Sequence, residues 1–113
     1  MAPCAPYTAV ALASFKPEVG IDLEEIKERD AGFAEMVVNA EELNLYKNHQ
    51  HKTEGITQWW VAKEAYGKSM GVGLQGDPRK YTISEVHDDS LKIKNTWIQT
   101  FKYNQFMIGY TNN

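Results

Sequence analysis

Two carboxylates stand close together early in the chain, at Asp22 and Glu24. They lie in residues 19–24, where apolar and polar side chains alternate as in a half-buried β-strand. Residues two positions apart in a strand emerge on the same face, so both carboxylates should point the same way. Adjacent carboxylates repel each other, and Mg²⁺ offsets that repulsion when waters and phosphates complete its coordination. The simpler interpretation of Asp-x-Glu is a strand face exposed to solvent.

A second group of charged residues lies in residues 56–70, which the pattern predicts to be a helix ending at Gly71. Trp60, Glu64 and Lys68 follow one another at intervals of four and therefore share one stripe of that helix. Lys63 is adjacent to Glu64 and points off the stripe. Glu64 and Lys68 also make the favourable i,i+4 pair of any exposed helix, worth about 0.3–0.5 kcal/mol. By itself this helix therefore indicates little.

Together, the strand and the helix would supply three carboxylates and two ammonium groups. Oxygen ligands of this kind hold Mg²⁺, and lysines bind phosphate. The combination suits a magnesium-bound pyrophosphate, where the chemistry is mostly positioning and the neutralisation of charge.

The elements that must position these residues can be predicted from the periodicity of the chain. Asn39 caps a helix that runs to about Lys47, and Glu42 stands three residues later in the capping-box position. Residues 88–90 form a hairpin turn, and residues 104–105 form a turn or bulge. Strands are predicted at residues 6–15, 19–24, 81–86, 91–96 and 97–110, a further short helix at 31–38, and a polar loop at 48–55. The two first strands should be neighbours, and the order of elements predicts one α+β domain with helices packed on an antiparallel sheet.

The stretch G-V-G-L-Q-G, residues 71–76, matches the G-x-G-x-x-G pattern of dinucleotide-binding loops. Such a loop follows a strand and opens a helix, because the phosphates meet the helix N-terminus. Here the glycines follow a helix and precede Asp77-Pro78. We interpret them as a helix C-cap and a loop.

Bulk composition excludes several classes of protein. The 113 residues fit a single domain, and the formal net charge of -3 argues against a nucleic-acid binder. No apolar run is long enough to span a bilayer, so we expect no membrane association. The one cysteine, Cys4, permits no internal disulfide, which fits the cytoplasm.

The two charged segments also resemble a known signature. V-G-I-D-L-E at residues 19–24 and W-V-A-K-E-A-Y-G-K at residues 60–68 are similar to the motif pair of the 4'-phosphopantetheinyl transferases, at about the same separation. The resemblance covers most of the chain, from about Tyr7 to Tyr110.

The resemblance implies a reaction and a set of roles. The family moves the phosphopantetheine arm of coenzyme A onto a serine of an acyl or peptidyl carrier protein. Asp22, Glu24 and Glu64 would hold Mg²⁺ on the pyrophosphate, Lys68 would pair with a coenzyme A phosphate, and Lys63 would lie close by and also bind coenzyme A. Glu64, or a water on the metal, would take the proton from the carrier serine. Trp60 would pack beside the site and contact coenzyme A.

The family has a short form that assembles as a trimer and a form with two similar halves in one chain. Glu24 and the C-terminal residues 97–110 resemble the second half of the two-half type, which primes surfactin synthetase. Ala2-Pro3 stands where that type carries Ser-His. The chain also resembles transferase domains fused to polyketide synthases. We therefore expect a C-terminal half or fragment of a longer protein, which self-associates as a dimer or trimer. The alternatives are a non-catalytic module that binds a carrier protein or a partner subunit, and a plain α+β domain.

Overall fold

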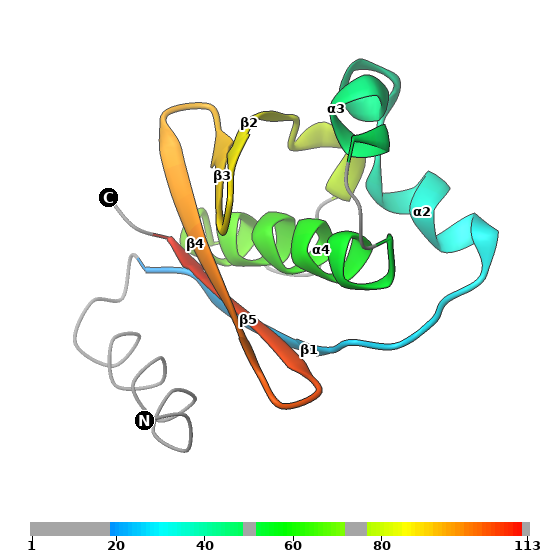
Figure 1. The fold of residues 1–113 in the computed structure, drawn as a ribbon. Coiled ribbons are helices and arrows are strands. Elements are labelled where there is room, and N and C mark those ends of the chain that lie inside the picture. The colour runs from blue at the N-terminus through cyan, green and yellow to red at the C-terminus, as the bar shows by residue number, and fades with distance from the viewer. Residues whose placement is uncertain (1–18, 49–51, 72–76, 112–113) are drawn as a thin grey trace.

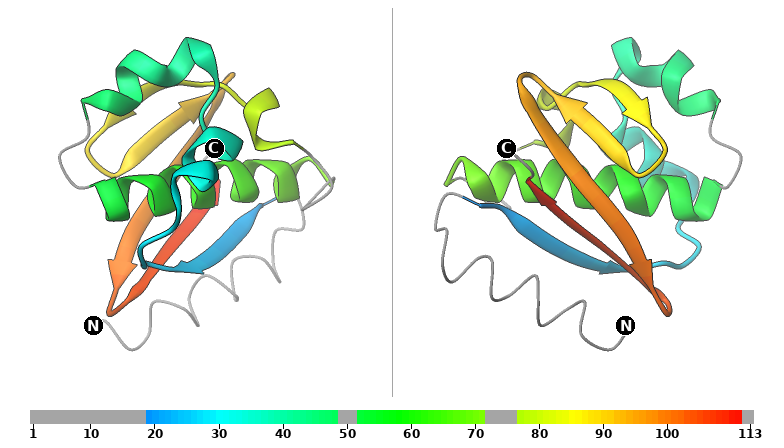
Figure 2. Two further views of the ribbon diagram at one scale, coloured as in Figure 1. Left: turned by 90° about the vertical axis from the view of Figure 1, so that its right-hand side faces the viewer. Right: turned by 60° about the vertical axis from the view of Figure 1, so that its left-hand side comes forward.

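The computed structural model describes residues 19–48, 52–71 and 77–111. Within them, five antiparallel strands form one sheet in the order β1-β5-β4-β3-β2. The sheet lies on one side of the long helix α4 and the short helix α2 lies on the other (Figures 1 and 2). The strands are β1 (Ile21–Glu25), β2 (Ile83–His87), β3 (Ser90–Ile93), β4 (Thr96–Tyr103) and β5 (Phe106–Thr111); the helices are α2 (Ala31–Val37), α3 (Leu43–Lys47) and α4 (Lys52–Ser69), with 3₁₀ turns η2 (Ala40–Glu42) and η4 (Pro78–Lys80). The predicted α+β class is confirmed.

Helix α4 is the centre of the molecule. From residue 55 to residue 67 every position except Trp60 is buried, because the sheet covers one side of the helix and α2 with its flanking turns covers the other. Trp59, Ala62, Ala65 and Tyr66 of α4 meet apolar residues of α2, β2, β3 and β4 in one core. A polar side chain in this buried stretch must find a partner inside the protein, so Lys63 and Glu64 are not ordinary surface residues.

Strand β1 pairs with β5, the last strand of the described chain, and Asp22 faces Gly109 in that register. A side chain at position 109 would point towards α4, because a Cβ added to Gly109 would stand 2.4 Å from Val61 Cγ1. Glycine therefore lets β5 lie close to the helix. The predicted strand at residues 6–15 lies outside the described residues, so its pairing with β1 stays a prediction.

Two predicted segments need correction. Residues 52–55 belong to α4 and not to the polar loop predicted at 48–55, because burial of Gly55 in the core outweighs its low helix propensity. The strand predicted at 91–96 ends at Ile93, where Lys94 turns the chain with φ 54° and Thr96 begins β4. Lys-Asn at this turn lacks the glycine that usually marks a tight hairpin.

Several local predictions are confirmed. Asn39 and Glu42 form a reciprocal capping box. The turn at residues 88–89 is present, and a second turn separates β4 from β5 at residues 104–105. Gly71 follows α4 with φ 82°, a left-handed conformation that glycine adopts without strain. The other two glycines of the G-x-G-x-x-G match lie outside the described residues. None of the described helices is long and apolar enough to cross a membrane.

Candidate active site on strand β1 and helix α4

The structure brings Asp22 of β1 together with Glu64 and Lys68 of α4. Lys68 Nζ donates to Asp22 Oδ1 at 2.8 Å. Asp22 is 4% exposed and Glu64 is 3% exposed, whereas the side chain of Lys68 remains 39% exposed. Lys68 therefore pairs with a carboxylate of the strand, and the simple interpretation of Glu64 and Lys68 as a surface helix pair is wrong.

A close approach of backbones makes this meeting possible. Gly20 lies directly against α4, and a Cβ on it would stand 1.7 Å from the carbonyl oxygen of Ala65. The amide of Gly20 donates to Thr111 Oγ1 at 3.0 Å, and its carbonyl accepts from the amide of Thr111 at 2.9 Å. These bonds hold the start of β1 on β5, and the absence of a Cβ at Gly20 lets β1 lie against α4, so that Asp22 reaches Glu64 and Lys68.

The two buried carboxyl groups disturb each other. Burial raises the pKa of Glu64 from 4.5 to about 7, and the charges of Asp22 and Glu24 add to the rise while Lys68 opposes it. Burial likewise raises the pKa of Asp22 from 3.8 to about 6, against the hydrogen bond and charge of Lys68. Glu24 lies on the same face of β1 and raises the pKa of Asp22 further. Three acidic side chains therefore lie close together, and Lys68 is the cation that the pKa shifts of both buried carboxyl groups reflect.

The residues fit a divalent cation by their chemistry. Asp22 Oδ2 and Glu64 Oε1 are buried oxygens without a hydrogen-bond partner, and anionic oxygens are the ligands that Mg²⁺ prefers. Among the described residues, no three metal-binding side chains already converge on one point. Asp22 Oδ1 accepts a hydrogen bond from Lys68, so Oδ2 is the oxygen of Asp22 that is available to a metal ion. The predicted set of Asp22, Glu24 and Glu64 as metal ligands stays a prediction.

The prediction that Lys63 binds a phosphate of coenzyme A needs correction. Lys63 is fully buried, and its Nζ is paired with Glu42 Oε1 at 2.7 Å. Burial lowers the pKa of Lys63, although the Glu42 carboxylate opposes this change. Successive residues of a helix point about 100° apart, so Glu64 faces β1 while its neighbour faces the α2–α3 corner. Sequence reasoning treated Glu42 only as a capping residue and missed this pair.

Trp60 lies one turn before Glu64 and packs on the ring of Phe33, with ring centroids 5.3 Å apart. It is half-buried, which leaves part of the indole accessible. Its predicted contact with coenzyme A stays a prediction.

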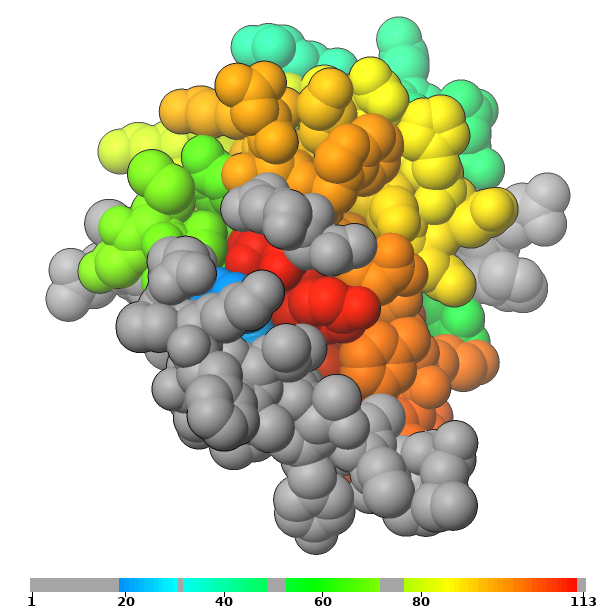
Figure 3. Space-filling model, turned by 90° about the vertical axis from the view of Figure 1, so that its left-hand side faces the viewer, coloured from blue at the N-terminus to red at the C-terminus, as the bar shows by residue number. Residues whose placement is uncertain are grey.

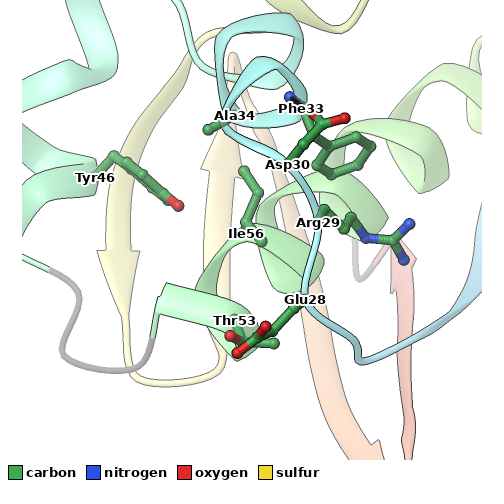
Figure 4. Close-up of a pocket in the computed structure, with 8 residues that line it drawn as sticks. All are labelled: Glu28, Arg29, Asp30, Phe33, Ala34, Tyr46, Thr53 and Ile56. Carbon is green, nitrogen blue, oxygen red and sulfur yellow. Dashed lines mark hydrogen bonds between the residues drawn. The ribbon is translucent and has the colours of Figure 1, made fainter.

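A hollow of about 280 Å³ opens on a different part of the molecule. Figure 4 shows its lining from the loop before α2, from α2 and α3, and from the first turns of α4: Glu28, Arg29, Asp30, Phe33, Ala34, Tyr46, Thr53 and Ile56. None of the predicted site residues lines it. The hollow is therefore distinct from the cluster of Asp22, Glu64 and Lys68.

The raised pKa values predict how stability depends on pH without divalent cations. A carboxyl group whose folded pKa lies above its unfolded value binds more protons in the folded state, so stability falls as pH rises through that window. For Asp22 and Glu64 the window runs from about pH 4 to about pH 7. We expect a loss on the order of 2 kcal/mol in the free energy of unfolding, measured by urea titration in EDTA. The slope should be shallower in Glu64→Gln, and an equal slope in that variant would contradict the assignment.

Comparison with known proteins identifies the family of this chain. Residues 18–109 match the 4'-phosphopantetheinyl transferase superfamily. The chain belongs to this superfamily. A holo-(acyl-carrier-protein) synthase of Streptococcus agalactiae serotype III is 39% identical over 79 residues, which span 62% of this chain and 66% of that protein. An L-aminoadipate-semialdehyde dehydrogenase-phosphopantetheinyl transferase of Candida glabrata is 32% identical over 104 residues, which span 85% of this chain and 39% of that protein. The chain thus covers less than two thirds of either relative.

Solved structures of the superfamily share the fold. The holo-(acyl-carrier-protein) synthase of Thermotoga maritima aligns with a TM-score of 0.69 at 21% identity, covering 82% of this chain and 60% of that one. The Neisseria meningitidis synthase aligns with a TM-score of 0.68 at 15% identity, covering 82% of this chain and 94% of that one. At these identities the likeness concerns the fold alone.

Proposed function

We propose that this chain transfers the 4'-phosphopantetheine group of coenzyme A to a serine of an acyl or peptidyl carrier protein, with Mg²⁺ as cofactor. The observation that carries the proposal is the meeting of Asp22, Glu64 and Lys68, where two buried carboxylate oxygens lack partners beside an accessible lysine. Membership of the superfamily supports the same reaction.

The proposed roles follow from chemistry at each atom. In the reaction the serine Oγ bonds to the phosphorus that carries the pantetheine arm, and the bond from that phosphorus to adenosine 3',5'-bisphosphate breaks. Glu64, with a pKa near 7, takes the serine proton. Lys68, which bonds to Asp22 here, would bind a phosphate of coenzyme A, and Asp22 and Glu24 would help to hold the cation. Mg²⁺, when bound, would neutralise the charge of the pyrophosphate.

We further propose that the chain self-associates as a dimer or trimer. Leu23 of β1 is 43% exposed on the sheet face opposite α4. On the same face, the rings of Phe101 and Tyr110 pack 6.4 Å apart and are half-buried. Side chains of β4 and β5 reach the surface on this side (Figure 3). An apolar sheet face of this kind is typical of a subunit interface.

The test is a calorimetric titration of coenzyme A with and without Mg²⁺, followed by mass spectrometry of an apo carrier protein after incubation. We expect binding that requires Mg²⁺ and a carrier that gains the phosphopantetheine group. Sedimentation of the same sample reports the assembly, and a monomer throughout the micromolar range would contradict self-association. Binding of a carrier protein without turnover would favour the alternative of a non-catalytic module. Failure to bind coenzyme A would overturn the proposed activity of this chain.

A further inference from the structure

Glu42 and Lys63 form a buried polar cluster on the side of α4 away from β1. Both side chains have no exposure to solvent. Lys63 Nζ donates to Glu42 Oε1 at 2.7 Å and also to the carbonyl of Val37. Glu42 Oε1 accepts from the amide of Asn39 at 2.9 Å, and Oε2 accepts from the amide of Ile83. Two side chains therefore join the end of α2, the turn η2, helix α4 and the start of β2.

A buried ion pair contributes little net stability to a fold. Two charges lose their hydration on burial, and apolar residues of similar volume often stabilise a protein as well or better. The bonds of Glu42 and Lys63 are directional, however, and fix the angle at which each side chain leaves its element. The contacts of α4 around Ala62 and Ala65 are apolar and carry no such direction.

The rotation of α4 about its axis matters because Glu64 follows Lys63 directly. A carboxylate on a helix stands roughly 6 Å from the axis, so a rotation of about 20° moves it by about 2 Å. Mg²⁺ accepts ligands only near 2.0–2.1 Å, with little tolerance in geometry. A rotation too small to unfold the core would therefore move Glu64 too far from Asp22 for both carboxylates to bind one Mg²⁺ ion.

We propose that Glu42 and Lys63 are positioning residues, which set the rotation of α4 so that Glu64 meets Asp22 at the proposed site. The inference rests on the proposed function, because it assigns these residues to the same magnesium and phosphate site. Lys63 acts through Glu42 and touches neither coenzyme A nor the metal.

A double-mutant cycle distinguishes this role from a direct phosphate contact. We measure the affinity for coenzyme A in Mg²⁺ for Glu42→Gln, Lys63→Met and the double variant, under conditions where each is folded. Each single variant should lose about 10-fold or more, as for other residues that orient ligands, and the double variant should lose no more than the worse single one. Losses that multiply in the double variant would mean that the two residues act independently, and would overturn the proposal.

Two further measurements keep the result clear. The double variant buries no charge and should fold even if a single variant does not; wild-type affinity in it would overturn the proposal. Leu91→Ala, a cavity variant in the core, controls for general loss of stability. It should leave coenzyme A affinity unchanged, and an equal loss there would show that the pair only stabilises the fold.

If the proposed function itself is wrong, a different result is expected. In that case wild type itself does not bind coenzyme A, and the backbone amide chemical shifts of Asp22 and Lys68, which are not adjacent to a substituted residue, report the position of α4. The double variant should shift these resonances more than Leu91→Ala does. Equal shifts in the two variants would overturn the positioning role independently of coenzyme A.

Discussion

Glu64→Gln should lower kcat/KM for the proposed priming of a carrier protein by about 10³-fold, the size expected for losing a proton acceptor. The substitution keeps the shape of the side chain and removes its charge. The loss should appear in kcat, since the proton is transferred as the serine attacks. Binding of coenzyme A in Mg²⁺ should weaken as well, because one anionic oxygen has gone from the site. The measurement is steady-state priming of an apo carrier protein followed by mass spectrometry.

The fold of this variant should remain intact. Glu64 is buried with one oxygen unpaired and near the charges of Asp22 and Glu24. Removing its charge at pH 8 therefore relieves repulsion, and the free energy of unfolding without divalent cations should rise. The matched control is Glu54→Gln on the same helix, where the carboxylate pairs with Lys102 at 2.8 Å and both side chains are exposed. The control should retain activity within about twofold, because an exposed pair contributes little. A Glu64→Gln variant that primes its carrier at the wild-type rate would refute the role of this residue.

Gly20→Ala should destabilise the protein by about 3 kcal/mol or more, because a buried overlap with backbone cannot be relieved by a side-chain rotation. The added Cβ would overlap the carbonyl oxygen of Ala65 and crowd the amide of Ser69, which lies 2.6 Å from the same position. Only a movement of β1 away from α4 makes room for the methyl group. That movement carries Asp22 away from Glu64, so activity should fall even at temperatures where the variant is folded. Urea unfolding measures the first effect, and priming of a carrier protein measures the second.

Gly32→Ala provides the comparison for this variant. Gly32 is exposed in α2, and the nearest atom to an added Cβ is Asp30 Oδ1 at 3.4 Å. Alanine favours a helix over glycine, so this variant should be neutral or up to about 1 kcal/mol more stable. Similar losses at both positions would mean that the contact between β1 and α4 is not the cause.

The charged positions of the site could be predicted from the sequence because they depend on local spacing. Asp22 and Glu24 share a face by the period of a strand, and Glu64 and Lys68 share a stripe by the period of a helix. Their partners depend on tertiary contacts, which local spacing does not contain. Lys68 bonds to Asp22 of another element, and Lys63 is turned towards Glu42 by the burial of α4 on nearly all sides.

The elements of the fold likewise divide into those set by local sequence signals and those set by tertiary contacts. The capping box of Asn39 and the glycine stop after α4 are signals within a few residues, and both were predictable. The start of α4 at Lys52 was not, because burial of Gly55 within the fold outweighs the low helix propensity of glycine. The pairing of β1 with β5 joins segments near opposite ends of the described chain, and no periodicity indicates it.

That pairing has a consequence for synthesis on the ribosome. Chains emerge N-terminus first, and contacts between distant segments form late. Asp22, Glu64 and Lys68 all leave the exit tunnel before β5 does, yet β1 has no partner among the described strands until Phe106–Thr111 is available. A nascent chain that stops short of β5 would therefore carry every residue of the proposed active site and still lack the site. The proposed active site is completed by a strand that contributes none of its charged groups.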